Sequence, residues 1–209
     1  METEQAIDQT RPVVAFDFDG TLTIQDSYTA FLRWRAGSGG YLAGLADLVP
    51  ELIAYPLRRD RGRLKAAATR TFLGGVSAEL VAGEARQFAD AVWDRFLRPD
   101  ALACWESWGR RGATRVIVTA SPTLTVRPFA DRLRADLLLG TELAIADGKL
   151  TGDFATPNCR AEEKVVRLQA AFGPEIRLAA AYGDTSGDTE MLAMAAHRGW
   201  REFVQRPKS

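Results

Sequence analysis

The sequence predicts an α/β protein: a doubly wound parallel sheet with a small all-helical cap inserted after the first strand. Two observations lead to this fold class. Apolar runs alternate with stretches of helical period in residues 12–25 and 99–209, which is typical of a parallel sheet covered by helices. From Tyr41 to about Leu97 the sequence follows a helical period and contains no convincing strand. We therefore expect a core domain formed by residues 12–25 and 99–209 and a helical cap domain formed by residues 26–98.

Length and composition indicate one globular core with an insertion and no preference for nucleic acid. The chain has 209 residues, and Lys+Arg and Asp+Glu number 27 each, so no overall positive field favours nucleic acid. Only two cysteines, Cys104 and Cys159, are present, which is typical of a reduced cytoplasmic protein. The polar, acidic first residues are unlike a signal peptide. We predict a cytoplasmic protein with residues 1–11 disordered, and the sequence leaves its oligomeric state open.

The first predicted strand leads into two carboxylates that stand one residue apart. Residues 13–16 are apolar and β-branched, as expected of a strand buried on both faces. An unpaired carboxylate inside such a strand would cost several kcal/mol. Asp17 and Asp19 are therefore expected at its C-terminal end, where open α/β sheets bind ligands. A hard divalent cation would relieve the repulsion between them.

The predicted cap consists of helices separated by glycines and a basic run. Asp26 and Ser27 can cap the first helix, and the glycines around residues 37–40 break it. An apolar face then repeats at helical spacing, at Leu42, Leu45, Leu48, Val49, Leu52 and Ile53. Ser77 is expected to cap a long helix whose buried face carries Val81, Ala85, Phe88, Val92 and Phe96.

The basic run of the cap admits two interpretations. It consists of six residues against the single acid Asp60: Arg58, Arg59, Arg61, Arg63, Lys65 and Arg70. Beside an apolar helix face, it would let the cap contact an anionic membrane peripherally, at its inner face. Alternatively, the helix packs within the cap and the arginines are solvated or pair with acids elsewhere. The segment 41–57 itself is too short and too interrupted by polar residues to span a bilayer.

The rest of the core alternates helices and strands. We expect strands at 115–118, 136–139 and 176–182, an edge strand at 199–204, and a hairpin of 141–145 and 149–154 turning at Asp147-Gly148. Helices are expected near 99–112, 126–133, 161–172 and 191–194. A polar turn at 119–122 should follow the second strand, with Ser121 capping the next helix. Three strands therefore end in hydroxyl or carboxylate clusters, which points to a site at one edge of the sheet.

These clusters resemble the four motifs of the haloacid dehalogenase (HAD) superfamily. Residues 17–23, Asp-Phe-Asp-Gly-Thr-Leu-Thr, resemble the first motif, and Thr119 resembles the second. Residues 159–164 resemble the third, with Lys164 in place and Ala161 where the family usually has glycine. Residues 183–188, Gly-Asp-x-x-x-Asp, resemble the fourth. The helical insertion is similar to that of subfamily IB, which contains phosphoserine phosphatase. The residues within the motifs are similar to those of the bacterial branch containing phosphatidylglycerophosphatase C.

The resemblance implies a Rossmann-like HAD core and a Mg²⁺-dependent phosphomonoester hydrolase working through an aspartyl-phosphate. Asp17 would be the nucleophile and Asp19 the general acid and base, with Lys164 stabilising charge. The residues implied in binding the substrate phosphate are Thr119, Ala120, Gly20 and Lys164. The residues implied in binding the metal are Asp17, Asp19 through its carbonyl, Asp184 and Asp188, the last either in the metal shell or just behind it.

The sequence leaves two candidates for the identity of the substrate. A lipid phosphate such as phosphatidylglycerophosphate is one candidate, and a small soluble metabolite such as phosphoserine is the other. A haloacid dehalogenase would need neither Mg²⁺ nor Asp19. Because Asp19 and the two acids of the fourth motif are all present, the sequence gives little support to a dehalogenase. A non-catalytic phosphate-binding module is the alternative from another class, and turnover of a chromogenic phosphomonoester distinguishes it from an enzyme.

Overall fold

A parallel sheet forms the centre of the molecule. The computed structural model describes residues 10–49, 53 and 61–208. Its five-stranded sheet has the order β3-β2-β1-β6-β7, and every neighbouring pair is parallel. The strands are β1 (Val13–Phe16), β2 (Thr114–Pro122), β3 (Leu137–Thr141), β6 (Leu178–Gly183) and β7 (Ala195–Trp200). The predicted fold class is confirmed, and β1 lies at the centre of the sheet.

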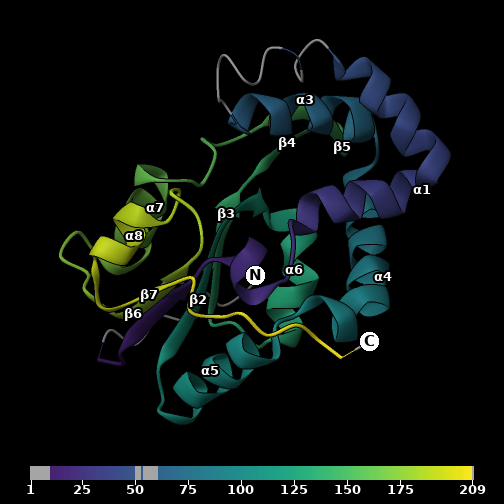
Figure 1. Ribbon diagram of the computed structural model, residues 1–209. Helices are drawn as coiled ribbons and strands as arrows, with labels where there is room; N and C mark the ends of the chain where they lie inside the picture. The colour runs from purple at the N-terminus through teal and green to yellow at the C-terminus, as the bar shows by residue number, and fades with distance from the viewer. Residues whose placement is uncertain (1–9, 50–52, 54–60, 209) are drawn as a thin grey trace.

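Helices cover both faces of this sheet (Figure 1). On one face lie α5 (Pro99–Arg110) and α6 (Thr123–Arg132), and on the other lie α7 (Glu162–Phe172) and α8 (Thr189–Ala193). Alternate side chains of β1 point to opposite faces of the sheet. Val14 and Phe16 pack with Trp105 and Phe129 on the α5 and α6 face. Val13 and Ala15 pack on the α7 face. A strand buried on both faces explains the continuous apolar run of residues 13–16.

The segment between β1 and α5 is helical, as the sequence predicts. It begins with the irregular helical turn η1 (Phe18–Leu22) and continues with α1 (Ser27–Asp47), α3 (Arg61–Leu73) and α4 (Ala78–Phe96). Asp26 caps α1, and Ser77 caps α4 by accepting a hydrogen bond from the Leu80 amide. The predicted break occurs at Gly37, whose φ of 65° interrupts the helical backbone before the chain resumes its helix. The expected face of α4 is buried throughout.

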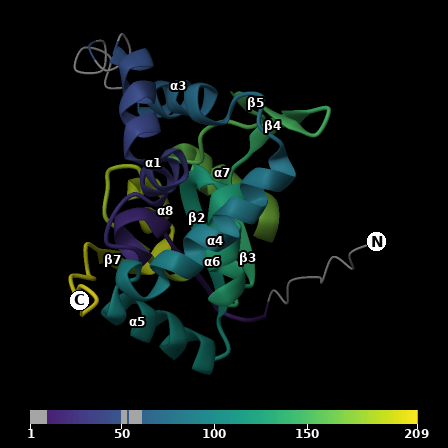
Figure 2. The same ribbon diagram turned by 90° about the vertical axis from the view of Figure 1, so that its right-hand side faces the viewer.

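The predicted hairpin is present and is joined to the helical segment. It consists of β4 (Leu143–Ala146) and β5 (Lys149–Phe154), which are antiparallel. The amide of Leu150 donates to the carbonyl of Val76, and Arg70 of α3 pairs with Asp153 at 2.6 Å. In Figure 2, α1, α3 and the hairpin together lie beyond one end of the sheet strands. The domain boundaries at residues 26 and 99 stay a prediction.

Two expectations about the core are wrong. Residues 119–122 are not a turn, because β2 continues through Pro122 with an irregular register after Val118. The edge strand is residues 195–200 rather than 199–204, since α8 is only five residues long and the chain enters β7 almost directly after it. The predicted disorder of residues 1–11 falls mostly outside the described residues. In the described part of the chain, no helix has the length and apolar character needed to cross a membrane.

Candidate active site

The carboxylate of Asp17 lies at the C-terminal end of the central strand. The backbone amide of Asp17 donates to the carbonyl of Tyr182 on β6 at 2.9 Å, which holds Asp17 between the ends of β1 and β6. The side chain is buried, with Oδ1 bound by Lys164 at 2.6 Å and Oδ2 accepting from the Thr21 hydroxyl at 3.3 Å. The chain then turns through Gly20, whose φ of 84° favours glycine, and a Cβ there would collide with Asp184.

Lys164 lies on the first turn of α7 and points into the core beneath Asp17. Its ammonium donates to Asp17 Oδ1, Asp188 Oδ1 and the Val118 carbonyl, each at 2.6 Å, so all three protons are used. Lys164 is only 1% exposed. Burial would lower the pKa of Lys164, but the charges of Asp17 and Asp188 raise it above its usual value. The ammonium therefore stays charged and holds together the end of β1, the middle of β2 and the loop that follows β6.

Ala161 introduces α7 in a conformation that alanine rarely adopts. Its φ of 56° and ψ of −127° lie in a region suited to glycine, and its amide donates to the Gly187 carbonyl at 2.8 Å. This backbone conformation explains why the family usually has glycine at this position. Alanine keeps the same path only because the neighbouring contacts impose it, at a cost of about 1–3 kcal/mol.

Ala161→Gly is expected to stabilise the protein. Relief of backbone strain should exceed the added entropy of the unfolded chain, so the free energy of unfolding should rise by about 1 kcal/mol. Urea denaturation monitored by circular dichroism measures this change. Ala82→Gly, inside helix α4, is the matched control and should lower stability by a similar amount. Equal destabilisation by both substitutions would contradict the strain at Ala161.

Asp184 and Asp188 follow β6 and complete an acidic cluster with Asp17. One carboxylate oxygen of each of the three lies within 4.8 Å of the others. Asp188 Oδ1 accepts from Lys164, and its Oδ2 accepts from the amide and hydroxyl of Thr185 and from the Asp184 amide. In contrast, Asp184 Oδ1 is buried and has no hydrogen-bond partner. An orphaned carboxylate oxygen facing a second carboxylate fits a hard divalent cation such as Mg²⁺.

The pKa values of these acids follow their surroundings. Burial raises the pKa of Asp17 to about 7, although the Lys164 ammonium opposes this shift. Burial and the charge of Asp188 also raise the pKa of Asp184. Burial alone would raise the pKa of Asp188, but Lys164 and the hydrogen bonds of Thr185 together hold it below its ordinary value. Asp17 and Asp184 are therefore the two acids whose ionisation a cation would favour most.

The side chain of Asp19 faces away from this cluster and toward the cap. Its Oδ1 accepts from the Ser27 amide at 2.7 Å, and its Oδ2 accepts from the Ser121 hydroxyl at 2.5 Å. The Thr119 hydroxyl lies 3.5 Å from the same Oδ2 and also accepts from the Ser121 amide. Burial and the charge of Asp26 raise the pKa of Asp19, although Lys65 and the hydrogen bonds from Ser121 and Ser27 oppose this shift.

The expected capping role of Ser121 is wrong. The N-cap residue of α6 is Pro122, and no side chain caps this helix. Because β2 extends further than expected, Ser121 stays in the strand and its hydroxyl binds Asp19. Ala120, expected to bind phosphate, lines the cavity above the site, and its carbonyl accepts from Lys65 and Thr141.

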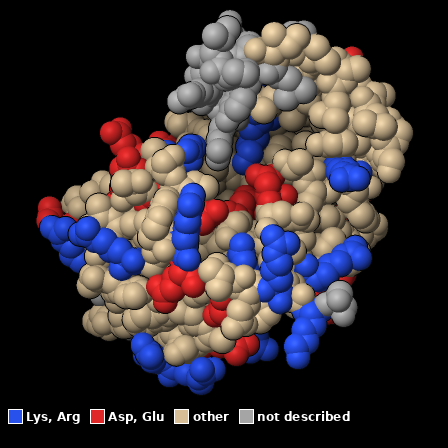
Figure 3. Space-filling model, viewed as in Figure 1, with Lys and Arg blue, Asp and Glu red and all other residues tan. Residues whose placement is uncertain are grey.

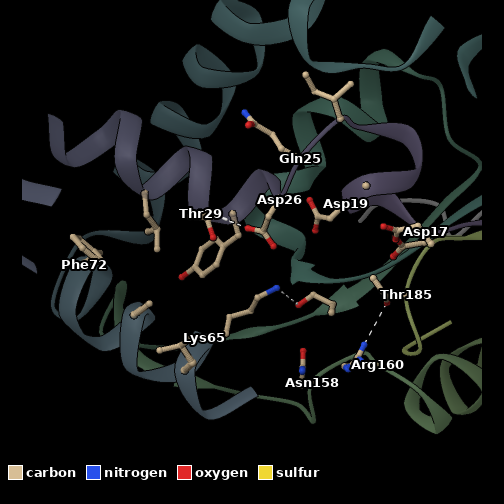
Figure 4. A pocket seen from close by; sticks show the side chains of 18 of the residues that line it. Asp17, Asp19, Gln25, Asp26, Thr29, Lys65, Phe72, Asn158, Arg160 and Thr185 are labelled. Carbon is tan, nitrogen blue, oxygen red and sulfur yellow. Dashed lines mark hydrogen bonds between the residues drawn. The ribbon is translucent and has the colours of Figure 1, made fainter. Parts of the chain in front are cut away.

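The placement of Lys65 in a surface basic run is also wrong. Lys65 of α3 points into the cavity, where its ammonium lies 3.2 Å from the Ala120 carbonyl and 3.3 Å from Ser121 Oγ (Figure 4). Arg70 pairs with Asp153, as the second interpretation of the run proposes. Arg58 and Arg59 lie outside the described residues. Nothing in the sequence around Lys65 distinguishes it from a solvated lysine. The sequence therefore does not predict that its side chain enters the site.

One cavity reaches part of this site. Asp17, Asp19, Asp184, Gly20, Ala120 and Lys65 line it, whereas the buried residues Thr119, Lys164 and Asp188 are not among the lining residues. The volume of the cavity is 710 Å³, and its floor includes Asp17, Asp19 and Asp184. Figure 3 shows acidic and basic side chains meeting inside a hollow below the cap helices. Asn158, Arg160 and Thr185 add polar atoms on the α7 side, where Arg160 donates to Thr185 at 3.5 Å (Figure 4). A negatively charged group can therefore enter between the acids at the sheet end and the cations beside them.

Comparisons with known proteins identify a family and several relatives of this chain. Residues 14–193 match the family of haloacid dehalogenase-like hydrolases. Protein CicA of Caulobacter vibrioides is 56% identical over 93% of this chain and 88% of its own length. Phosphoserine phosphatase of Halobacterium salinarum is 31% identical over 88% of this chain and 82% of its own.

Two solved structures share the fold. A Bordetella pertussis Tohama I protein of unknown function superposes with a TM-score of 0.72 at 24% identity, covering 88% of this chain and 86% of that one. A phosphoserine phosphatase carrying an analogue of the phospho-aspartyl intermediate superposes with a TM-score of 0.58 at 21% identity, covering 88% and 83%.

The match over residues 14–193 defines the class of protein. The chain belongs to the haloacid dehalogenase superfamily of hydrolases, and it is an enzyme of the phosphatase type.

Proposed function

We propose that the protein hydrolyses phosphomonoesters in two steps through an aspartyl-phosphate on Asp17. The observation that carries this proposal is the environment of Asp17, a buried carboxylate held by Lys164 at the floor of a 710 Å³ cavity. Lys164 binds Oδ1 and leaves Oδ2, with one weak contact from Thr21, to attack phosphorus. The phosphoserine phosphatase with a phospho-aspartyl analogue supports the same chemistry.

Asp19 is proposed as the general acid and base. Its raised pKa favours a proton that it donates to the leaving alcohol, and it then takes a proton from the water that hydrolyses the aspartyl-phosphate. Ser121 and the Ser27 amide hold its two oxygens in place. The hydroxyl of Thr119 and the backbone of Gly20 and Ala120 are proposed to bind phosphoryl oxygens, with Lys164 adding positive charge.

Mg²⁺ is proposed at Asp17 and Asp184, with the Asp19 carbonyl as a further ligand. When bound, it supplies positive charge for the phosphoryl oxygens and favours the ionised form of Asp17. Asp188 is proposed to lie just behind this shell, because both of its oxygens already accept hydrogen bonds from Lys164, Thr185 and Asp184. Its role is then to hold Lys164 and the loop that carries Asp184.

Asp184→Ala is expected to raise the Mg²⁺ concentration needed for activity by at least about tenfold, because it removes a charged ligand. The same variant should lose most of the Mg²⁺-induced rise in melting temperature, which reports binding directly. Titrations of both quantities, with EDTA removing activity, make the measurement. Asp94→Ala, an exposed acid on α4, is the control and should leave both titrations unchanged. An unaltered Mg²⁺ dependence in Asp184→Ala would remove Asp184 from the metal site.

Hydrolysis of p-nitrophenyl phosphate with Mg²⁺ tests the function itself. We expect multiple turnovers per enzyme molecule, which a non-catalytic phosphate-binding module would not give. Binding of phosphate without any turnover would favour that module instead.

For the natural substrate, two candidates have support. The Halobacterium salinarum relative supports a small soluble ester such as phosphoserine. Exposed apolar residues on the cap, Leu42, Val49 and Ile53, support a peripheral contact with membrane and a lipid phosphate such as phosphatidylglycerophosphate. Sedimentation with phosphatidylglycerol vesicles tests this contact, and binding should weaken in Leu42→Gln. Absence of binding at low salt would leave a soluble ester as the better candidate.

A further inference from the structure

The part of the cavity wall that belongs to the cap is apolar. The acids occupy the floor, whereas the cap side is formed by Leu32, Tyr41, Leu45, Leu48, Leu64 and Phe72. These residues come from both halves of α1, from Leu48 directly after it, and from α3. Tyr41 stacks on Phe72 with ring centroids 5.3 Å apart, which joins the two helices across the wall. We call this surface the cap wall.

The cavity is larger than a phosphoryl group requires. Its 710 Å³ lies in the range of about 300–1,000 Å³ found for sites that enclose whole small molecules. A phosphate at the floor would occupy only a small part of it. The rest of the space, next to the cap wall, is therefore available to the alcohol part of the ester.

Polar groups lie between the floor and the cap wall. Gln25, Asp26 and Thr29 line this zone from the N-terminal end of α1, and Lys65 lines it from α3 (Figure 4). Lys65 is already bound to Ala120 and Ser121, and Asp26 is bound to the Thr29 amide as the helix cap. Beyond these polar groups lies the cap wall. A polar group of a ligand packed against this wall would lose its hydrogen bonds to water, so the wall favours an apolar group.

We propose that the alcohol part of the substrate is amphiphilic, with an alkyl or acyl chain that packs against the cap wall. This inference rests on the proposed phosphomonoesterase function and names the class of ester that the same site prefers. The phosphate lies at the acidic floor, a short polar segment follows it, and the apolar chain covers Leu45, Leu64 and Phe72. A compact, fully polar ester such as phosphoserine leaves this wall in contact with water.

A series of alkyl phosphates tests the proposal. Ethyl, butyl, hexyl and octyl phosphate are assayed with Mg²⁺ below the concentrations at which they form micelles, and phosphate release gives kcat/KM. Burial of a methylene group corresponds to about a three- to fourfold gain in kcat/KM. We therefore expect about a tenfold rise for each two methylenes added, until the chain leaves the cavity.

Two cap-wall variants and one matched control localise the effect. Leu45→Gln and Leu64→Gln place an amide on the wall, and the ratio of kcat/KM for octyl to ethyl phosphate should fall by at least about tenfold. Leu80→Gln makes the same change on the neighbouring helix α4, but Leu80 is 53% exposed and does not line the cavity. Its ratio should equal that of the wild type. Circular dichroism checks that all three variants are folded.

The outcomes separate this inference from the proposed function. Hydrolysis of ethyl phosphate, phosphoserine and p-nitrophenyl phosphate with no dependence on chain length would overturn the inference and leave the function standing. A chain-length dependence that persists in Leu45→Gln and Leu64→Gln would overturn the assignment to the cap wall. Failure to hydrolyse any of these esters would overturn the proposed function, and the inference with it.

Discussion

Asp17→Asn is expected to lower kcat by about 10⁴-fold or more while leaving the fold intact. An amide does not attack phosphorus, and loss of a covalent nucleophile has effects of this order. Stability should change little, because the Asn carbonyl can still accept from Lys164, which keeps its bonds to Asp188 and Val118. Steady-state assays with p-nitrophenyl phosphate measure the rate, and thermal unfolding checks the fold.

Asp147→Asn is the matched control for this variant. Asp147 lies in the exposed turn of the hairpin and does not line the cavity, and asparagine accepts its positive φ of 50°. The control should keep wild-type activity. A folded Asp17→Asn protein with more than a few per cent of the wild-type rate would remove Asp17 from the role of nucleophile.

Lys164→Met is expected to be the most damaging substitution for stability and a severe one for catalysis. Methionine has a similar length but leaves Asp17 and Asp188 as neighbouring buried carboxylates without their cation. Breaking a buried ion pair from one side costs about 3–5 kcal/mol. Lost charge stabilisation should also lower kcat by about 10²–10³-fold.

Urea denaturation and steady-state kinetics measure the two effects of Lys164→Met. Lys149→Met, at an exposed position in β5, is the control and should change neither quantity by much. An unfolding free energy within about 1 kcal/mol of the wild type would show that Lys164 does not hold β1, β2 and the loop after β6 together.

The sequence predicts the sheet and the acids well because both depend on local pattern. The run at residues 13–16 identifies a strand buried on both faces, and the acids that follow it must lie at the strand end. Lys164 is found only through its motif, since nothing in the composition of α7 distinguishes it from a solvated lysine. The structure shows that it is among the most buried charged residues described.

Other features depend on contacts between distant segments, which local pattern does not report. Lys65 reaches Ser121 only because α3 lies over the end of β2, and Ser121 reaches Asp19 only because β2 continues past Val118. The strand β7 is displaced from its predicted position because residues 195–198 lack β-branched side chains and gain their pairing from β6. These are tertiary effects that override weak local preferences.

If Asp17 is the nucleophile, it carries a phosphoryl group during turnover. Wild-type enzyme mixed with Mg²⁺ and p-nitrophenyl phosphate is quenched in acid within one turnover, digested, and analysed by mass spectrometry. We expect one added phosphoryl group on the peptide containing Asp17, located on Asp17 by fragmentation and absent from Asp17→Asn. Turnover with the phosphoryl group on another residue, or with no adduct at any quench time, would contradict this role of Asp17.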